Sequence, residues 1–226
     1  MRGKLIVFEG TDSSGKHTQA KLLEKRLLNQ GKKIELSGFP TYQKTMLGEL
    51  VSRYLKGDFG SKEDTGPEIA TLFFVIDRYQ FKDIFRKKLD EGTTIILDRY
   101  IASNIFQAAH AEGEERFKIW EWAKTVQSRL PQPDVTIFLD MPPKVSEKLF
   151  AAREIKNALV GKSKDILEAD LAYQEKVRKL YLEIARKEGW IIIDCCKEGM
   201  LRKPEDIHEE VYEKLKERGI FQSDKY

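Results

Sequence analysis

The residues with the clearest chemistry form one short segment near the start of the printed sequence. Gly10, Gly15 and Lys16 match the pattern G-x-x-x-x-G-K. Glycines at these positions let the backbone turn so that its N–H groups face inward and hold phosphate oxygens, and the N-terminus of a following helix adds partial positive charge. Lys16 supplies a flexible cation for the terminal phosphates of a nucleotide. The sequence therefore predicts a nucleotide-phosphate site made by Gly10, Thr11, Asp12, Ser13, Ser14, Gly15, Lys16, His17 and Thr18.

The residue after the lysine departs from this pattern. Ser or Thr normally stands there and its hydroxyl reaches Mg²⁺, but here His17 is followed by Thr18. Mg²⁺ prefers oxygen ligands, so an imidazole is a poor replacement. Three explanations are open: water and the nucleotide phosphates hold the metal with Asp98 in its outer shell, Thr18 helps although it projects about 100° away around the helix, or the protein binds nucleotide and catalyses poorly. We favour the first, because Mg²⁺ usually keeps several waters.

Short apolar runs alternate with helix-length amphipathic segments along the chain. The predicted strands are residues 5–8, 33–37, 93–97, 135–139 and 190–193. The predicted helices are residues 16–30, 46–56, 67–90, 114–130, 144–152, 169–187 and 204–218. Continuous apolar strands need cover on both faces, as in a parallel sheet, and their alternation with helices implies right-handed crossovers. We therefore expect a single doubly wound α/β domain over residues 1–226, with about five strands and helices on both faces.

Composition excludes several classes of protein. The 226 residues are 41% hydrophobic, but their longest apolar runs have the length of a strand, which argues against a membrane protein. A net charge of +3, from 40 basic and 37 acidic residues, argues against strong attraction to nucleic acid or to an anionic membrane. Cys195 and Cys196 are adjacent and offer neither a disulfide framework nor a zinc site. With no apolar signal segment before the first strand, they favour the cytoplasm.

Polar residues follow each predicted strand, at the edge where parallel sheets bind ligands. Phe39-Pro40 comes after the second strand and Asp98-Arg99-Tyr100 after the third. Asp140 and Asp194 follow the last two strands. Polar residues at strand ends are ordinary, but the segments Phe39-Pro40 and Asp98-Arg99-Tyr100 are less so. We therefore expect these segments to line a site together with the phosphate loop.

Taken in order, these motifs resemble the thymidylate kinase family over about residues 4–215. The segments that carry the resemblance are Phe8-Glu9-Gly10-Thr11-Asp12 with Ser14-Gly15-Lys16, then Phe39-Pro40, Phe74-Val75-Ile76-Asp77-Arg78, Asp98-Arg99-Tyr100 with Ser103-Asn104, and Leu139-Asp140-Met141-Pro142. The resemblance implies a P-loop NTPase-type fold with a short lid. It also implies transfer of the γ-phosphoryl group of ATP to dTMP, with Mg²⁺, giving dTDP and ADP for dTTP synthesis. Members of the family are commonly homodimers, and the sequence has nothing decisive on that point.

The resemblance further implies catalytic roles for the matching residues. Lys16 spans the donor and transferred phosphates, and Arg99 binds the acceptor phosphate and the transition state. Two phosphates that repel each other must be brought in line, which suits a planar guanidinium. Asp98 positions the metal, through water. A surface salt bridge between Arg99 and Asp98 is the alternative to a catalytic role for the arginine.

Acceptor binding is implied for a second set of residues. Phe74 stacks on thymine and Arg78 hydrogen-bonds its carbonyl edge, the two being four residues apart and so on one helix face. Core packing is the alternative for Phe74. The other implied contacts are Asp12 with the sugar 3′-hydroxyl, Ser103 and Asn104 with the base, Phe39, Pro40 and Tyr42 with the phosphate and sugar, and Gln107 and Gln174 elsewhere on the acceptor.

The chain also departs from the family's pattern. An aromatic residue often crowds the sugar 2′ position where this chain has Gln107, so discrimination against ribonucleotides is in doubt. Some members carry a catalytic arginine in the phosphate loop, where this chain has Ser13. The polar segment at about 153–167 resembles a basic lid, and we expect its Arg153 to neutralise charge on ATP as an arginine finger does. A solvated basic linker is the alternative reading of that segment.

Two other functions stay open from the sequence. Gln107 raises the alternative of a kinase for another pyrimidine nucleoside monophosphate. His17 raises that of a nucleotide-binding protein with little turnover. A nucleic-acid-dependent ATPase is disfavoured by the small net charge and short chain.

Overall fold

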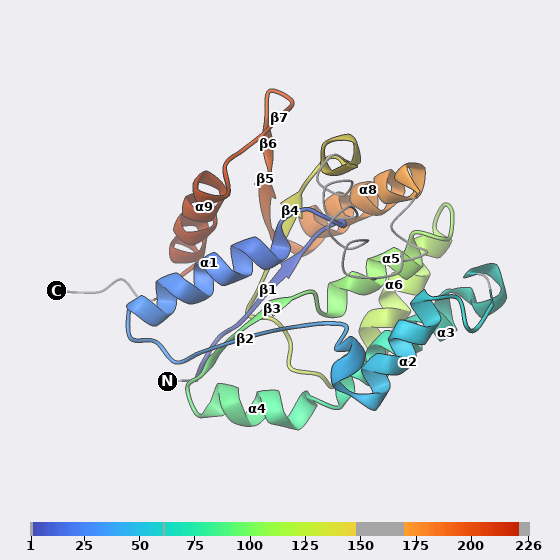
Figure 1. Cartoon of the computed structure of the whole chain (residues 1–226), viewed down its shortest axis with the longest axis horizontal. Helices are drawn as coiled ribbons and strands as arrows, with labels where there is room; N and C mark the ends of the chain where they lie inside the picture. Colours follow the sequence, from blue (N-terminus) through green and yellow to red (C-terminus); the bar gives the residue numbers. More distant parts are fainter. Residues whose placement is uncertain (1, 61, 148–169, 222–226) are drawn as a thin grey trace.

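Five parallel strands form the central sheet, in the order β2-β3-β1-β4-β5 (Figure 1). They are β1 (Leu5–Glu9), β2 (Ile34–Gly38), β3 (Thr94–Asp98), β4 (Val135–Asp140) and β5 (Ile191–Asp194). The structure is a computed structural model, and it describes residues 2–60, 62–147 and 170–221. The prediction of a doubly wound parallel sheet is confirmed, and each strand overlaps its predicted range.

Helices cover both faces of this sheet (Figure 1). One face carries α1 (Lys16–Asn29) and α9 (Pro204–Glu217). The other carries α2 (Met46–Leu55), α3 (Lys62–Tyr79), α4 (Lys82–Asp90), α5 (Ile105–Ala108), α6 (Glu115–Val126) and α8 (Leu171–Glu188). None of these described helices combines the length and apolar character of a membrane span.

The central strand β1 shows why the apolar runs are continuous. Successive side chains of a strand point to opposite faces. Leu5 and Val7 therefore pack in the core beneath α2 to α8, while Ile6 and Phe8 pack in the core beneath α1 and α9. All five residues of β1 are buried. Both cores depend on this strand, so the loop that follows it starts from a fixed point.

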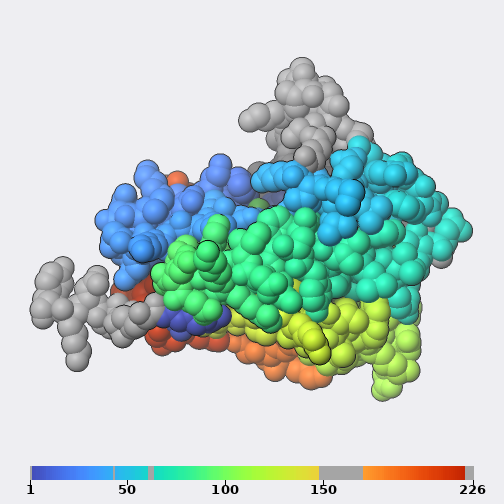
Figure 2. Space-filling model, turned by 90° about the horizontal axis from the view of Figure 1, so that it is seen from below, coloured from blue at the N-terminus to red at the C-terminus, as the bar shows by residue number. Residues whose placement is uncertain are grey.

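One predicted helix is wrong in its extent. The range 67–90 is two helices, because α3 ends at Tyr79 and α4 begins at Lys82. Between them, Phe81 packs edge-on against Phe39 at 5.6 Å and stacks on Phe85 at 5.8 Å between ring centroids. The apolar periodicity runs through the break, so the sequence pattern does not reveal the turn that this aromatic cluster requires. In the view from below, α2, α3 and α4 form one continuous cyan-to-green face (Figure 2).

Short elements that the sequence did not predict lie at the carboxyl edge of the sheet. Two 3₁₀ turns, η1 (Tyr42–Lys44) and η2 (Ile101–Asn104), follow the polar ends of β2 and β3. A hairpin of β6 (Cys196–Lys197) and β7 (Met200–Leu201) projects beyond β5 (Figure 1). The helix predicted at 144–152 is helical over 143–147, and its later residues fall outside the described ranges. The 3₁₀ turns shape the site described next.

Candidate active site

The phosphate loop is fixed between β1 and β4. A Cβ atom on Gly10 would lie 2.7 Å from the Ser14 hydroxyl oxygen and 2.8 Å from the carbonyl oxygen of Leu139 in β4. Ser13 and Gly15 have φ values of 56° and 88°, which turn the chain into the first residue of α1. Only glycine fits position 10, because any side chain there would meet the loop and the neighbouring strand.

Lys16 lies across this loop and is buried. Its Nζ donates to the carbonyl oxygen of Thr11 at 2.6 Å and to the Ser14 hydroxyl at 3.3 Å. Burial, together with repulsion from Arg99, lowers the pKa of Lys16 to about 8. Acidic neighbours, Asp98 first, oppose this shift. The loop therefore holds a cation that its own oxygens compensate only in part, which suits an incoming polyphosphate.

The outer side of the loop is more open. The side chain of His17 is 64% exposed, and its Nδ1 lies 3.5 Å from a carboxylate oxygen of Asp98. Thr18 is also exposed. Within the described ranges, no three His, Cys, Asp or Glu side chains gather as a metal-binding group. The residues present fit Mg²⁺ held largely by nucleotide phosphates and water, because Asp98 offers the single carboxylate that such a site needs.

A pocket opens beside the phosphate loop, at the carboxyl ends of β1, β2 and β3. Its lining residues are Asp12, Phe39, Pro40, Tyr42, Leu55, Phe74, Arg78, Arg99, Ser103, Phe106 and Gln107. All of these except Leu55 and Phe106 were predicted from the sequence as acceptor contacts. Leu55 and Phe106 were missed because apolar residues inside amphipathic helices carry no signal that separates a pocket wall from the core.

Arg99 stands between the phosphate loop and the pocket. Its guanidinium forms an ion pair with Asp12 and donates to the carbonyl oxygen of Gly10 at 3.1 Å. It also lies 5.1 Å from the ring centroid of Phe106. The residue has a φ of 68°, a left-handed conformation. In the described part of the chain its ion-pair partner is thus Asp12 in the loop, and the alternative of a surface salt bridge with Asp98 is wrong.

The far wall of the pocket comes from α3. Arg78 is 2% exposed, and its Nη1 donates to the side-chain oxygen of Gln127 at 2.6 Å. Burial lowers the pKa of Arg78 to about 10, although Glu9 opposes this shift. Phe74 is one turn away and meets Tyr54 edge-on at 6.0 Å. A flat ring and a buried guanidinium on one helix face can bind a planar heterocycle that carries a carbonyl group.

Asp77, between these two residues, holds the segment after β2. Its carboxylate accepts a hydrogen bond from the backbone N–H of Thr41 at 2.9 Å and another from the Thr41 hydroxyl. The side-chain amide of Gln80 donates to the same carboxylate at 2.8 Å. This anchoring fixes Phe39 and Pro40 in the pocket wall. The sequence marked Asp77 as part of a motif, but its partner 36 positions away was not predictable.

The remaining predicted site residues differ in where they lie relative to the pocket. Gln174 of α8 donates to the second oxygen of Asp12 at 3.0 Å. Asn104 is buried outside the pocket lining, and neither amide atom has a hydrogen-bond partner among the described residues. The side-chain oxygen of Gln107 also lacks a partner in that part of the chain. Arg153 lies outside the described residues.

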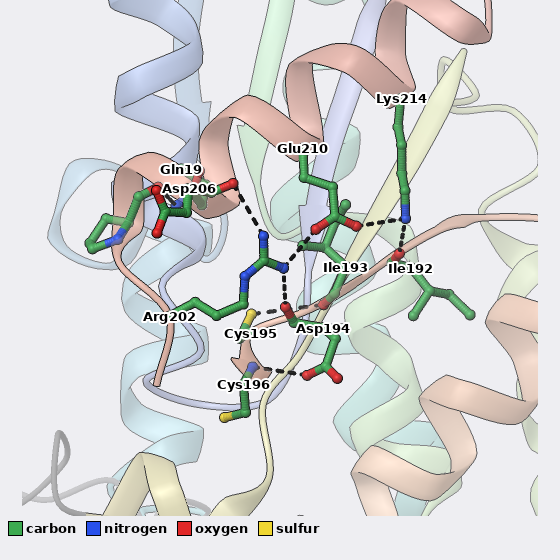
Figure 3. A network of polar contacts seen from close by, with 11 residues as sticks. Gln19, Ile192, Ile193, Asp194, Cys195, Cys196, Arg202, Asp206, Glu210 and Lys214 are labelled. Carbon is green, nitrogen blue, oxygen red and sulfur yellow. Dashed lines mark hydrogen bonds and ion pairs between the residues drawn. The ribbon is translucent and has the colours of Figure 1, made fainter. Parts of the chain in front are cut away.

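On the other side of the phosphate loop, a polar network ties the end of β5 to α9 (Figure 3). Arg202 donates to the carbonyl oxygen of Asp194 at 2.7 Å and to Glu210 at 2.6 Å. Lys214 donates to the carbonyl oxygen of Ile192 at 2.9 Å. Cys195 and Cys196 lie inside this region as buried free thiols. The network therefore fixes the segment that follows β5.

Comparison with known proteins agrees with this geometry. The family model described as thymidylate kinase matches residues 8–211. The thymidylate kinase of Schizosaccharomyces pombe is 31% identical, covering 98% of this chain and 96% of that protein. The human enzyme is 29% identical, with 93% and 88% covered. The solved thymidylate kinase of Candida albicans superposes with a TM-score of 0.74 at 27% identity, covering 97% of this chain and 93% of that one. The chain therefore belongs to the thymidylate kinase family, the enzymes that phosphorylate dTMP.

Proposed function

We propose that the chain transfers the γ-phosphoryl group of ATP to the phosphate of dTMP, with ATP on the loop and dTMP in the adjoining pocket. One observation carries this proposal. Arg99 and Asp12 lie where the phosphate loop meets a pocket whose far wall presents Phe74 and Arg78. A nucleoside monophosphate in that pocket would direct its phosphate toward the loop and its base toward α3.

The reaction then depends on neutralising two anionic groups while they are held in line. Lys16 binds the terminal phosphates of ATP, exchanging the Thr11 carbonyl for phosphate oxygens. Arg99 leaves part of its contact with Asp12 to bind the acceptor phosphate and the charge that develops in the transition state. Release from Arg99 frees an oxygen of Asp12 to accept a hydrogen bond from the sugar 3′-hydroxyl.

Mg²⁺ would neutralise charge on the phosphates of ATP when bound. Asp98 would hold it through water, because this carboxylate lies beside the loop and is partly exposed. His17 then pairs with Asp98 and does not serve as a ligand. From the family resemblance we also propose that Arg153 adds positive charge at ATP, so that Arg153→Ala lowers kcat at least about tenfold by loss of transition-state charge stabilisation. An unchanged kcat would remove that role.

The far wall of the pocket, formed by α3, selects the base. Phe74 stacks on the thymine ring, and Arg78 donates to a carbonyl oxygen of the base. The cost of burying Arg78 supports this role, because a buried guanidinium nitrogen, Nε, has no partner among the described residues. Ser103 adds a hydroxyl to the pocket lining, whereas a contact of the base with Asn104, which is buried outside the lining, rests on the family resemblance alone.

The decisive experiment compares nucleoside monophosphates as acceptors. ADP release is measured with ATP, Mg²⁺ and dTMP, dUMP, UMP or CMP. We expect the highest kcat/KM with dTMP. A higher value with UMP or CMP would contradict the substrate assignment, and ADP formation near background with every acceptor would favour a nucleotide-binding protein with little turnover.

A wider acceptor range is the second candidate, and Gln107 favours it. This residue lines the pocket and its side-chain oxygen has no hydrogen-bond partner among the described residues, so it can accept one from a ribose hydroxyl. The Candida albicans enzyme is described as having broad substrate specificity. Gln107→Tyr should then reduce kcat/KM for UMP and leave dTMP turnover nearly unchanged.

We also propose a homodimer in the cytoplasm. Ile69 and Leu72 lie one turn apart on α3 and expose 51% and 37% of their surface, which offers an apolar strip for a second copy. The free thiols of Cys195 and Cys196 suit a reducing compartment. Light scattering of the purified protein tests the dimer, and Ile69→Lys should shift it toward the monomer.

A further inference from the structure

Glu9, the last residue of β1, is fully buried directly before the phosphate loop. Its carboxylate accepts three hydrogen bonds: from the backbone N–H of Tyr100 at 2.8 Å, from the hydroxyl of Ser103 at 2.7 Å and from the hydroxyl of Tyr181 at 3.0 Å. A buried carboxyl group is costly to keep unless its oxygens are satisfied, and here each has a protein donor.

Two of these donors belong to the arc 99–103, which begins with Arg99. Tyr100 follows Arg99 directly, and Ser103 is three residues further on. The N–H of Arg99 itself donates to the carbonyl oxygen of Phe8 at 2.9 Å. Residues 8 and 9 of the central strand therefore hold both ends of this arc.

The backbone conformation of Arg99 needs the support of these hydrogen bonds. Its φ of 68° is unfavourable for a residue other than glycine, and it persists only where the surroundings determine it. This conformation directs the guanidinium back across the loop toward Asp12 and Gly10. If the arc relaxed, the guanidinium would leave the junction between the loop and the pocket.

The third donor, Tyr181, comes from another element and shares an oxygen of Glu9 with Ser103. Tyr181 of α8 is fully buried and stacks on Phe138 of β4 with ring centroids 5.1 Å apart. Two turns earlier on α8, Gln174 donates to Asp12, the ion-pair partner of Arg99. Helix α8 therefore supports Arg99 twice, at its backbone through Glu9 and at its guanidinium through Asp12.

We propose that Glu9 is a positioning residue of the phosphoryl transfer, which acts by holding the arc 99–103 so that Arg99 meets the acceptor phosphate. This inference rests on the proposed function of Arg99. Neither Glu9 nor Tyr181 lines the acceptor pocket, so both are expected to act through Arg99 and not on the substrate.

Two variants test the inference in the full-length protein. Glu9→Gln keeps the size of the side chain but removes its charge and replaces one acceptor oxygen by an NH₂ group, so that Ser103, Tyr181 and Tyr100 can no longer all donate to it. Tyr181→Phe removes one hydroxyl and keeps the ring. The matched control is Tyr212→Phe, which removes the hydroxyl that Gln30 donates to at 2.8 Å on the opposite face of the sheet. Each is measured for kcat, for KM of ATP and of dTMP, and for Tm.

We expect Glu9→Gln to lower kcat about tenfold, and Tyr181→Phe to lower it less, because small misplacements of a catalytic group are costly. The KM of ATP should stay unchanged, and Tyr212→Phe should leave kcat unchanged. In an Arg99→Ala background, single-turnover measurements should show no further loss from either change, because residues that act through one another are not additive.

Equal fractional losses in the two backgrounds would overturn the inference and leave the proposed function standing. A lowered Tm with kcat unchanged would also overturn it, because that is the result of a purely structural role. If Glu9→Gln does not fold, Tyr181→Phe carries the same test. An Arg99→Ala protein with normal kcat would refute the proposed role of Arg99, and this inference with it.

Discussion

Around Arg99 the polar groups are held by several parts of the protein, whereas among the described residues the ammonium group of Lys16 hydrogen-bonds within the phosphate loop itself. The acceptor side draws on β1, α3 and α8 through Glu9, Asp77 and Gln174. On the donor side, Lys16 bonds only to the loop's own oxygens, and the hydroxyls of Thr11 and Ser13 have no partner among the described residues. The difference suggests that the acceptor side is formed in advance, while ATP completes the donor side.

The largest effect should come from the best-supported residue of the acceptor side. Arg99→Ala should lower kcat by about 10²–10³, as removal of a donor to developing charge does. Arg26→Ala is the matched control, because Arg26 pairs with Glu209 on the opposite face of the sheet. Steady-state ADP release measures both. A loss below about threefold for Arg99→Ala would contradict the role of this arginine in stabilising developing charge.

A smaller effect is expected at the far wall. Phe74→Ala should raise the KM of dTMP about tenfold with little change in the KM of ATP, because an aromatic stacking partner is lost. Phe117→Ala, a change of a partly buried phenylalanine on α6, is the control for general loosening of this layer. If the KM of ATP rose instead, Phe74 would belong to the packing of the core and not to the acceptor site.

The affinity of the phosphate loop for ATP should depend on pH. Because Lys16 has a pKa of about 8 without ligand, and phosphate favours its charged form, ATP binds best below pH 8 and its affinity falls as pH rises. Between pH 7 and pH 9 the Kd should increase about tenfold, with proton uptake on binding near pH 8.5. Calorimetry in buffers of different ionisation enthalpy measures both quantities. Lys16→Met should bind ATP weakly at every pH, and a wild-type Kd that is flat over this range would contradict the assignment.

The smallest effect is expected at the exposed histidine. His17→Ser should change kcat with Mg²⁺ by less than about threefold, because Mg²⁺ keeps its waters and the nucleotide supplies its other oxygens. Asp98→Asn serves as the comparison and should cost more. A gain above tenfold for His17→Ser would instead support the view that this residue restrains turnover.

Most residues of this site could be predicted from the sequence because its motifs lie at strand ends, where the topology of the sheet brings them together. The order of strands put Gly10, Phe39 and Asp98 at one edge, and the residues that follow them line the pocket. The family resemblance was needed for Phe74, whose apolar neighbours made core packing an equal alternative.

What could not be predicted depends on partners far apart in the chain. The pairing of Arg99 with Asp12 and the three donors to Glu9 join residues 87 to 172 positions apart. One signal for Glu9 was present, because a carboxylate at the end of a buried apolar strand needs donors. The break between α3 and α4 had no signal in the sequence, because Phe81 fits the helical pattern that it interrupts.

The two thiols beside β5 have a practical consequence. Cys195 is fully buried, and burial raises its pKa to about 12; Cys196 is 9% exposed and its pKa is raised as well. The thiolate is the nucleophile that attacks a maleimide, and burial disfavours this form, so maleimide dyes should label the folded protein very slowly. A cysteine introduced at an exposed position could then carry a fluorophore without prior removal of the native pair, which opens this enzyme to single-molecule measurements of its working cycle.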